Sequence, residues 1–346
     1  MRKTEISSVE IAKLAGVSRS TVSRVINNYS NVPPETREKV MKVIREHHYV
    51  PNLSAQVLAG KGTRTIGLFM IETEQVSRDI LSNMMLVSII ENASINGYYV
   101  LTSIIRDTAD RDIIRGVKDI FYQRRIDGGI FIGAANEEPF IEELIAEGYI
   151  VGVVDQRLPG RSEANRVVVN FDNDYGMMLA VKYLRSLNHT EIGVVAGDMK
   201  RSSGETKLEG FKEAMRHNGL RWNEDWIIPG GFHESDGYEA MRSFMRSGKR
   251  LPTAIVMAND SVAFGAIRAL REHGVEIPKD VSIVGFDDHE LSSRFQPPLT
   301  TIKVDFGAMM KELTEAVIGH IEDDEAEAFE YTVRSELVVR DSCRKL

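Results

Sequence analysis

Apolar residues recur along the chain with two different spacings. Over residues 8–15, 18–27 and 35–49 they return every three or four positions, which places them on one face of a helix. From residue 65 onward, short Val- and Ile-rich runs alternate with helix-length amphipathic stretches. Continuous apolar strands separated by helices indicate parallel sheets that helices cover on both faces. The pattern therefore predicts a small all-α domain followed by a larger α/β domain.

The first two predicted helices meet at a glycine. Gly16 ends the first helix, for which Ser8 is a candidate cap, because glycine readily adopts a positive φ. Ser18 follows as a suitable N-cap for the second helix, in which Val22 and Val25 form the apolar side. Two short helices joined in this way, the second with a polar outer face, predict a helix-turn-helix motif whose second helix enters the major groove of DNA.

The polar face of the second helix supplies candidate groups for contacting DNA. We expect base contacts from Arg19, Ser20, Arg24 and Asn27. An arginine that binds guanine with two hydrogen bonds contributes roughly 1–3 kcal/mol of discrimination. We expect phosphate contacts, which position the protein without reading sequence, from Ser18, Thr21, Ser23 and Asn31. The alternative is that these are ordinary solvated residues of a small helical domain.

The pattern also predicts how the chain divides. We expect a helix-turn-helix domain over 1–50, a hinge helix and linker over 51–62, and a larger domain over 63–346. We expect the larger domain to form two lobes, the first over about 65–160 with a later crossing of the C-terminal segment, and the second over about 165–300. The polar stretch that follows Asp155 is the predicted connection between the lobes.

Polar residues follow several predicted strands of the larger domain. They are Asp155 to Arg157, Asp198 to Arg201, Asn259 with Asp260, and Asp287 with Asp288. In open parallel sheets, ligands bind beyond the carboxyl ends of the strands, so these residues predict a ligand site in a cleft between the lobes. The alternative is that they cap the following helices, as Asp260 could.

Charge is distributed unevenly between the two predicted domains. The chain has a formal net charge of -8, but residues 1–64 carry 11 Lys and Arg against 5 Asp and Glu. A basic head on an acidic body indicates that the head alone meets a polyanion, because phosphate would repel the remainder. This asymmetry favours a nucleic-acid interface in the first domain.

Composition excludes several classes of protein. We find no apolar run near the roughly 18 residues that span a bilayer, and no apolar segment behind the basic start, so we expect a cytoplasmic protein without a membrane partner. Cys343 is the single cysteine, so we expect no internal disulfide and no cysteine-based metal cluster. Catalytic motifs such as GxSxG, the P-loop and HExxH are absent. We therefore expect no enzyme activity, no cofactor and no metal.

Several segments resemble the LacI/GalR family of repressors. The segments are IAKLAGVSRSTVSRVINN, VPPETREKV, YVPNLSAQVLAGK, MANDSVAFGAIRALREHGVEIPKDVSIVGFDD and PPLTTI. The resemblance implies an all-α helix-turn-helix domain, then a two-lobed α/β effector domain of the periplasmic-binding-protein type with parallel sheets. It also implies minor-groove contacts from the hinge, where Leu58 would wedge between bases with Ala55 beside it and Asn52 at the start of the hinge helix.

The resemblance also assigns an effector site. It places Arg201, Lys207, Phe232, Asn259 and Asp287 around the ligand, with a first-lobe contribution from residues 72–82. Lys207 stands where the family usually has arginine, and the loop after residue 71 lacks the family's Asn-Pro-aromatic run. Arg157 would add a third positive charge. These cations allow an anionic effector, although nearby aspartates would offset them.

The predicted function is allosteric control of transcription. We expect a homodimeric repressor that binds a near-palindromic operator in double-stranded DNA and responds to a small molecule, most simply a sugar or sugar derivative. The apolar stretch 80–93 is a candidate for the dimer interface. One alternative is a regulator of the same fold that responds to a partner protein or a corepressor. A solute-binding transport component is another, which the basic head and the lack of an export signal disfavour.

Overall fold

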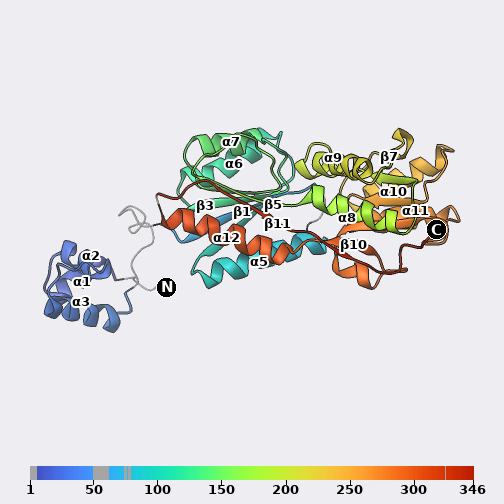
Figure 1. Ribbon diagram of the computed structural model, residues 1–346. Helices are drawn as coiled ribbons and strands as arrows, with labels where there is room; N and C mark the ends of the chain where they lie inside the picture. Colours follow the sequence, from blue (N-terminus) through green and yellow to red (C-terminus); the bar gives the residue numbers. More distant parts are fainter. Residues whose placement is uncertain (1–5, 50–61, 74–75, 77–78, 324) are drawn as a thin grey trace. The chain divides into compact units, whose positions relative to one another are not determined.

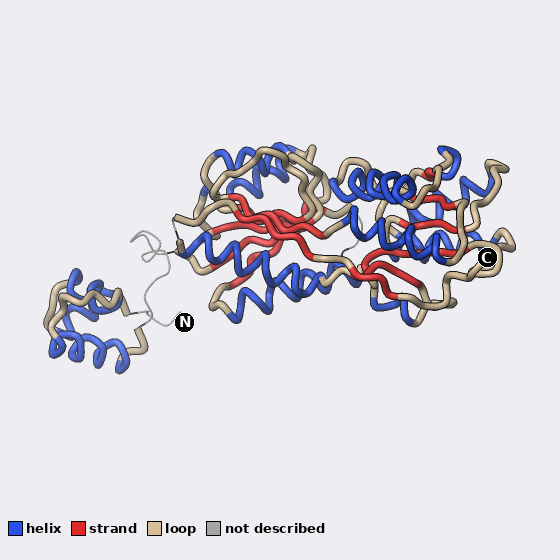
Figure 2. The backbone as a smooth tube through the Cα atoms, in the orientation of Figure 1, coloured by secondary structure: helices blue, strands red, loops and turns tan. Residues whose placement is uncertain are grey.

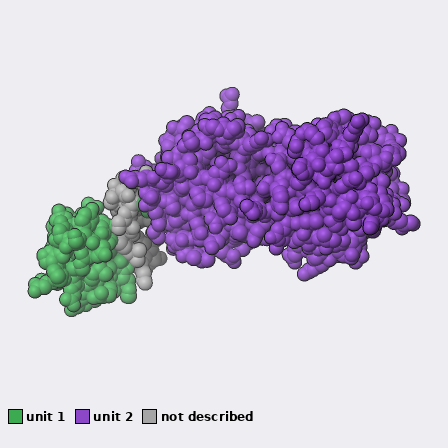
Figure 3. Space-filling view, viewed as in Figure 1, with its two compact units in different colours: residues 1–63 green, residues 64–346 purple. Residues whose placement is uncertain are grey.

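The structure, a computed structural model, describes residues 6–49, 62–73, 76, 79–323 and 325–346. The chain divides into two compact units, residues 1–63 and residues 64–346, which Figure 3 shows in different colours. The predicted hinge, residues 51–62, lies almost entirely outside the described residues. Each unit has its own hydrophobic core, so each is described separately.

The described part of the first unit is helical. Its helices are α1 (Ser8–Ala15), α2 (Arg19–Ile26) and α3 (Pro34–Glu46). Ile11, Val22 and Val40 have no exposed surface and form the centre of the core. Gly16 adopts a φ of 66° and its N–H bonds back to α1, so it ends this helix as predicted. Ser18 caps α2 by accepting a hydrogen bond from the N–H of Thr21, also as predicted.

One predicted cap is displaced by a residue. Ser7, rather than Ser8, is the N-cap of α1, because its hydroxyl accepts from the N–H of Glu10 while the Glu10 carboxylate accepts from the N–H of Ser7. This reciprocal arrangement is a capping box, which satisfies two backbone donors at once. Two adjacent serines leave the sequence ambiguous, and the glutamate three residues later decides which one caps.

The second unit contains two six-stranded sheets within its described residues (Figure 2). The first sheet has the order β11 (Phe329–Val333), β5 (Arg166–Phe171), β4 (Val151–Val154), β3 (Gly128–Ile132), β1 (Thr65–Ile71) and β2 (Tyr99–Ile105). The second has the order β12 (Glu336–Val338), β10 (Thr300–Lys303), β9 (Ser282–Asp287), β8 (Ala254–Met257), β6 (Ile192–Val195) and β7 (Ile227–Ile228). Within the described residues every strand pairing is parallel except that of β12 with β10, which confirms the predicted parallel sheets.

Helices cover the faces of both sheets (Figure 1). Those of the first lobe are α5 (Ile80–Ile95), α6 (Arg111–Tyr122), α7 (Pro139–Ala146) and α12 (Phe306–Glu322). Those of the second are α8 (Asn173–Ser186), α9 (Ser202–His217), α10 (Glu234–Arg246) and α11 (Asp260–Glu272). Short 3-10 turns lie at Glu224–Trp226 and Glu290–Ser293. Helix α12 follows a strand of the second sheet in the chain but packs beside α5 on the first.

The predicted boundary between the lobes is wrong. Strand β5 was assigned to the second lobe, but it pairs with β4 and β11 in the first sheet. The polar stretch after Asp155 therefore joins two neighbouring strands of one sheet rather than two lobes. The chain instead passes from one lobe to the other at three places. These are α8, α12 and the segment between β11 and β12. A Val-rich run is equally apolar in either sheet, so its composition could not assign it.

Two residues of the second lobe have structural roles. His189 is fully buried, where Nδ1 lies 2.9 Å from the Thr253 hydroxyl and Nε2 lies 2.9 Å from the Arg344 carbonyl oxygen. Burial lowers the pKa of this imidazole, and both ring nitrogens contact other parts of the lobe, so His189 has a structural role. Burial also raises the pKa of the Cys343 thiol to about 12, so the thiolate form is disfavoured.

Candidate functional site

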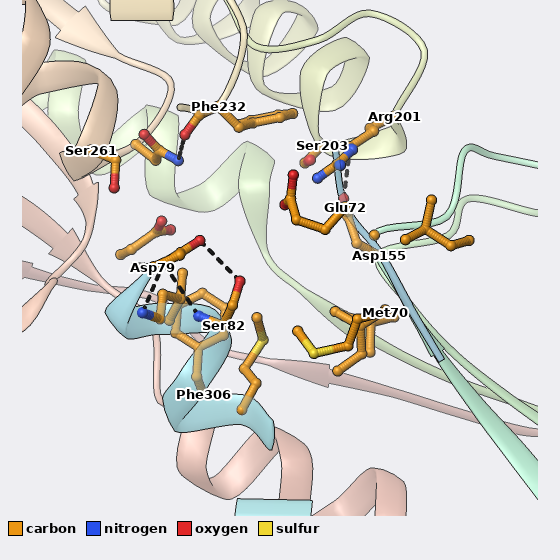
Figure 4. A pocket seen from close by; sticks show the side chains of 18 of the residues that line it. Met70, Glu72, Asp79, Ser82, Asp155, Arg201, Ser203, Phe232, Ser261 and Phe306 are labelled. Atoms are coloured by element: carbon orange, nitrogen blue, oxygen red, sulfur yellow. Dashed lines mark hydrogen bonds between the residues drawn. The ribbon is translucent and has the colours of Figure 1, made fainter. Parts of the chain in front are cut away.

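A cavity lies between the two lobes at the carboxyl ends of their strands (Figure 4). First-lobe strands β1, β3 and β4 contribute their last residues and the loops that follow, and α5 contributes its first turn. The second lobe contributes the starts of α9 and α11 and the end of β9. A parallel sheet brings these ends to one edge, so the cavity lies where the sequence predicts a ligand site.

The structure brings together five of the six effector residues that the sequence predicts. Arg201, Lys207, Phe232, Asn259 and Asp287 all line the cavity. Arg157 does not line it, so the structure does not bring this residue together with the other five. Its guanidinium instead pairs with the carboxylate of Glu209 at 2.9 Å, with both side chains more than 60% exposed. Arg157 follows Asp155, which lines the cavity, by only two positions in the chain, but its side chain turns to the outer surface.

The Phe232 ring packs tightly on Gly197, and Arg201 lies against the same ring. A Cβ on Gly197 would lie 2.4 Å from the Phe232 ring, so glycine is needed for the ring to occupy its place. The Arg201 guanidinium lies 5.7 Å from the centroid of that ring. It also approaches Gly133 of the first lobe, where a Cβ would lie 3.6 Å from Nη2. Arg201 therefore reaches across the cleft from the second lobe, and it forms no ion pair among the described residues.

Lys207 is buried to 3% exposure on α9. Its Nζ donates to the carbonyl oxygen of Ala258 at 2.7 Å. The same atom lies 3.8 Å from the ring centroid of Phe286, 5.4 Å from that of Phe171 and 5.8 Å from that of Phe232. Burial lowers the pKa of this amine, and nearby carboxyls, Asp287 first, act in the opposite direction.

Asn259, rather than Asp260, caps α11. Asn259 is the N-cap of α11, where Oδ1 accepts from the N–H of Val262 at 2.8 Å and Nδ2 donates to the carbonyl of Phe232. Its amide is therefore satisfied by the protein. Asp260 is fully buried beneath the cleft, and burial raises the pKa of its carboxyl to about 7. Two adjacent polar residues at a strand end did not reveal which would cap.

Asp287 combines strain with an unpaired carboxyl. Its φ of 108° is unfavourable for a residue with a Cβ, and strain of this kind clusters at functional sites. Within the described residues its carboxyl oxygens accept no hydrogen bond, although they face the cavity. Burial raises the pKa of this carboxyl to about 8, against an opposing effect of Lys207. The site thus holds a polar group that a ligand can satisfy.

Sequence reasoning did not assign roles to several other lining residues. Asp155, at the end of β4 with a φ of 59°, accepts a hydrogen bond from the N–H of Ser203 across the cleft at 3.0 Å. Glu72 of the first lobe pairs with His233 of the second at 3.3 Å. Asp155 is among the strand-end residues that the sequence places at the predicted ligand site, although no specific role was predicted for it. His233 carried no sequence signal, because its role depends on how the two lobes meet.

Carboxyl groups outnumber Lys and Arg side chains among the residues that line the cavity. The lining carboxyls are Glu72, Asp79, Asp155 and Asp287. The lining cations are Arg201 and Lys207, and Lys207 is already bonded to a carbonyl. No cluster of three or more His, Cys, Asp or Glu side chains suited to a metal ion occurs in the part of the chain that the structure describes.

The predicted DNA-contacting residues of α2 share one face. Arg19, Ser20, Ser23 and Arg24 are exposed, whereas Val22 and Val25 of the same helix are buried. Hydroxyls at its start are linked, with Ser18 Oγ 2.7 Å from Ser20 Oγ and 2.8 Å from Thr21 Oγ1. Asn27 lies at the end of the helix and Asn31 in the exposed turn that follows. Asn52, Ala55 and Leu58 lie outside the described residues.

Two family models match the chain. The model for bacterial regulatory proteins of the lacI family matches residues 9–52, which include nearly all of α1 and the whole of α2 and α3. A model for a periplasmic binding protein-like domain matches residues 181–343.

None of the helices in the described segments is both long enough and apolar enough to span a bilayer.

Relatives of similar length match along nearly the whole chain. The HTH-type transcriptional repressor PurR of Vibrio parahaemolyticus is 32% identical over 346 residues, which covers 97% of this chain and 98% of that protein. The lac repressor dimer bound to operator and the anti-inducer ONPF has a TM-score of 0.80 at 28% identity, covering 99% of this chain and all of the other. A transcriptional regulator CelR–cellobiose complex has a TM-score of 0.75 at 27% identity, covering 97% and 99%.

Proposed function

The chain belongs to the lacI family of bacterial regulatory proteins and is a DNA-binding transcriptional repressor, and from this premise we propose that a small polar molecule in the interlobe cleft controls its affinity for an operator. The observation that carries the proposal is the cavity itself. Both lobes line it, and Asp287 presents an unpaired carboxyl there. A ligand that touches both lobes stabilises one relative arrangement of them, which is how binding energy becomes a conformational signal.

The lining favours an uncharged, polyhydroxylated effector over an anion. Of the three cations expected to attract an anion, Arg157 lies elsewhere and Lys207 is bonded to Ala258, so Arg201 alone remains. Four carboxyl groups line the same cavity. Carboxyls accept hydrogen bonds from hydroxyls, and the rings of Phe171 and Phe232 suit the C–H surface of a sugar. This supports a sugar or a sugar derivative.

Calorimetry with matched sugars tests this effector class. We expect micromolar to millimolar binding of a neutral sugar from a panel of glucose, galactose, cellobiose and maltose, and no binding of glucose 6-phosphate or gluconate. Arg201→Gln tests the remaining cation and should weaken neutral sugars only modestly. Tight binding of the phosphate or the acid, abolished by Arg201→Gln, would contradict the proposal.

For DNA recognition we assign base reading to the exposed face of α2. Arg19, Ser20, Arg24 and Asn27 would enter the major groove, while Ser18, Thr21, Ser23 and Asn31 hold phosphates. The support is the exposure of Arg19, Ser20, Ser23 and Arg24 on one face of α2 and the match of residues 9–52 to the lacI family model. For the hinge we retain the proposal that Leu58, with Asn52 and Ala55, contacts the minor groove.

We also propose that the repressor acts as a homodimer through α5. Met84, Val87 and Ile95 are 43%, 49% and 81% exposed on this helix, an unusual concentration of apolar side chains on a surface. The solved lac repressor that resembles the chain is a dimer on its operator. Two heads related by twofold symmetry predict a near-palindromic site.

Selection of randomised duplex DNA by the purified full-length protein tests DNA recognition. We expect a near-palindromic site for the wild type, altered half-site bases for Arg19→Ala, and weaker binding without altered bases for Leu58→Ala. Arg45→Ala, which removes the same charge from an exposed position on α3, is the matched control and should keep the wild-type site. An Arg19→Ala variant that selects the wild-type bases would remove that residue from base reading.

A further inference from the structure

A second cavity adjoins the one described above. It is bordered by the start of α5 from the first lobe and, from the second, by the starts of α10 and α11 and the turn that follows β9. We call it the outer cavity, and the one described above the inner cavity. We propose that the outer cavity binds a second sugar unit, so that the effector is a disaccharide or a longer saccharide. The inference rests on the proposed function and narrows its effector to a size class.

The two cavities share part of their lining. The shared residues come from both lobes and are Glu72, Asp79, Phe232, His233 and Ser261. Figure 4 shows Ser261 and Asp79 on one side of the inner cavity and Arg201 and Asp155 on the other. The outer cavity therefore adjoins the side of the inner cavity that lies away from Arg201, and a saccharide that spans the two places one unit in each.

The inner cavity alone is small for a ligand site. Its volume is about 140 Å³, whereas ligand sites commonly measure roughly 300–1,000 Å³. The outer cavity has a volume of about 260 Å³. Only the two together reach the usual range, which favours a ligand that occupies both.

The outer cavity is the more exposed of the two. Ile80 and Leu291, which line only the outer cavity, are 38% and 41% exposed. Met70, Val154 and Phe306, which line only the inner cavity, are buried. A saccharide that enters with one end enclosed in the inner cavity therefore has its following units nearer to solvent, where a longer chain can continue.

Two polar groups of the outer cavity have no hydrogen-bond partner among the described residues. One is the hydroxyl of Ser261, which lines both cavities (Figure 4). The other is Nε2 of His289. Its Nδ1 accepts from the N–H of Leu291 at 3.1 Å, so in the neutral imidazole the proton is on Nε2, which can donate. The hydroxyls of a second sugar unit can satisfy both groups.

Aromatic rings supply the apolar surface that a sugar ring needs. Phe232 lines both cavities, and Phe264 lines the outer one. The Phe264 ring is fixed in place, because it stacks on Phe295 with centroids 4.6 Å apart and meets the His289 ring edge-on at 5.5 Å. Rings held in this way provide a firm surface for the C–H groups of a sugar.

The charges of the outer cavity suit an uncharged unit. Its described lining residues include no Lys or Arg that would attract an anion. Its carboxyl groups already have partners, because Glu72 pairs with His233 at 3.3 Å, Glu234 pairs with Arg268 at 2.5 Å, and Asp79 caps the start of α5. These partners leave little demand for a cationic ligand.

Calorimetry with matched sugars tests the proposal on the full-length protein. The pairs are glucose against cellobiose and maltose, and galactose against lactose and melibiose. We expect the best disaccharide to bind at least ~10-fold more tightly than its monosaccharide, because each hydrogen bond that the second unit adds contributes roughly fivefold.

Variants of the outer cavity separate its contribution from that of the inner one. His289→Asn keeps an acceptor for the N–H of Leu291 but removes the Nε2 donor, so disaccharide binding should weaken about fivefold while monosaccharide binding stays unchanged. Leu291→Trp fills the outer cavity and should abolish the advantage of the disaccharide. His217→Asn, at an exposed histidine at the end of α9, is the matched control and should change neither.

The outcomes distinguish this inference from the proposed function. A disaccharide advantage that His289→Asn reduces supports the inference. Disaccharides that bind no more tightly than their monosaccharides, or an advantage that both outer-cavity variants retain, would overturn it and leave the proposed function standing. Binding of none of the six sugars would instead contradict the proposed effector class, and this inference with it. Should Leu291→Trp fail to fold, the wild type and His289→Asn still decide.

Discussion

Asp260 is a carboxyl group in the core of the second lobe. Its Oδ1 accepts from the Thr301 hydroxyl at 2.6 Å, and its Oδ2 accepts from the Ser292 hydroxyl at 2.6 Å and the N–H of His289 at 2.8 Å. These bonds tie the start of α11 to the segments that follow β9. They do not fully offset desolvation, which raises the pKa of the carboxyl to about 7.

Stability should therefore depend on pH through Asp260. An unfolded aspartate titrates near pH 3.9, so between about pH 4 and pH 7 the folded chain holds one proton more than the unfolded chain at this site. This contribution is fully present below pH 4 and is lost as pH rises to about 7, at roughly 1 kcal/mol per unit. Asp260→Asn should remove this slope in urea unfolding measured across that range.

The control for this prediction is a surface aspartate. Asp112, whose side chain is 81% exposed, pairs with Arg115 on α6. Asp112→Asn should leave the pH dependence of the unfolding free energy unchanged. Equal slopes for wild type and Asp260→Asn would mean that the Asp260 carboxyl is ionised in the folded protein at pH 5.

At the residue scale, the sequence predicted which side chains lie at the cleft better than it predicted what each of them does there. Arg201, Lys207, Phe232, Asn259 and Asp287 reach the cleft because strand ends and helix starts of a parallel sheet share an edge. Whether a side chain then faces a ligand, caps a helix or turns outward depends on neighbours distant in sequence. This is why Asn259 is a cap and Arg157 pairs with Glu209 outside the cleft.

Helices α10 and α11 approach each other through a pair of glycines. A Cβ on Gly265 of α11 would lie 1.9 Å from the carbonyl oxygen of Glu234, and one on Gly237 of α10 would lie 2.1 Å from that of Val262. Both obstacles are backbone atoms of the neighbouring helix, which cannot rotate away. The close contact buries Val262 and Ala266 and sets the position of α11, whose first turn borders the cleft.

Gly265→Ala should consequently destabilise the protein. The added methyl group must push the two helices apart, an overpacking effect for which we expect about 3 kcal/mol. The matched control is Gly319→Ala on α12, where a Cβ would meet no atom within 4 Å. That change should be neutral or stabilise by up to ~1 kcal/mol, because alanine favours helices over glycine. Urea unfolding of both variants measures the difference, and equal effects would refute the contact.

At the scale of elements, the hydrophobic pattern predicted the strands and helices well. It predicted less well which strands pair with one another. Helices α1, α2 and α3 and the alternation of strands and helices follow from periodicity. Strand β5 was assigned to the wrong lobe, because pairing depends on the path of the chain between strands. Composition of a single strand contains no information about that path.

Basic residues are concentrated in the part of the chain that we expect to attract DNA, and the remainder of the chain is acidic. The excess of basic residues in the first 64 residues contrasts with the net charge of -8 for the whole chain. Operator binding should release cations from DNA, so its affinity should fall steeply with salt, by about 10³-fold between 50 and 200 mM for a dimer making six or more phosphate contacts. Fluorescence anisotropy in a salt series measures the slope. A flat series would exclude phosphate-dominated binding.

Dimerisation through α5 makes a separate prediction. Val87→Asp places a charge in the exposed apolar stripe and should give monomers in light scattering, with much weaker operator binding. Val339→Asp is the control, because Val339 is 56% exposed outside α5 and should leave the dimer intact. A dimeric Val87→Asp protein would place the interface elsewhere.

The last two strands have a consequence for synthesis. The first sheet ends with β11 and the second with β12, and both strands fall within residues 329–338. Until the ribosome has produced these residues, β5 and β10 each expose an unpaired edge, the kind of surface that promotes aggregation. Neither lobe can therefore complete its sheet while most of the chain is being made. A nonsense mutation upstream of residue 329 would therefore damage both lobes at once. It would remove a strand even from the first lobe, whose other five strands lie far earlier in the chain.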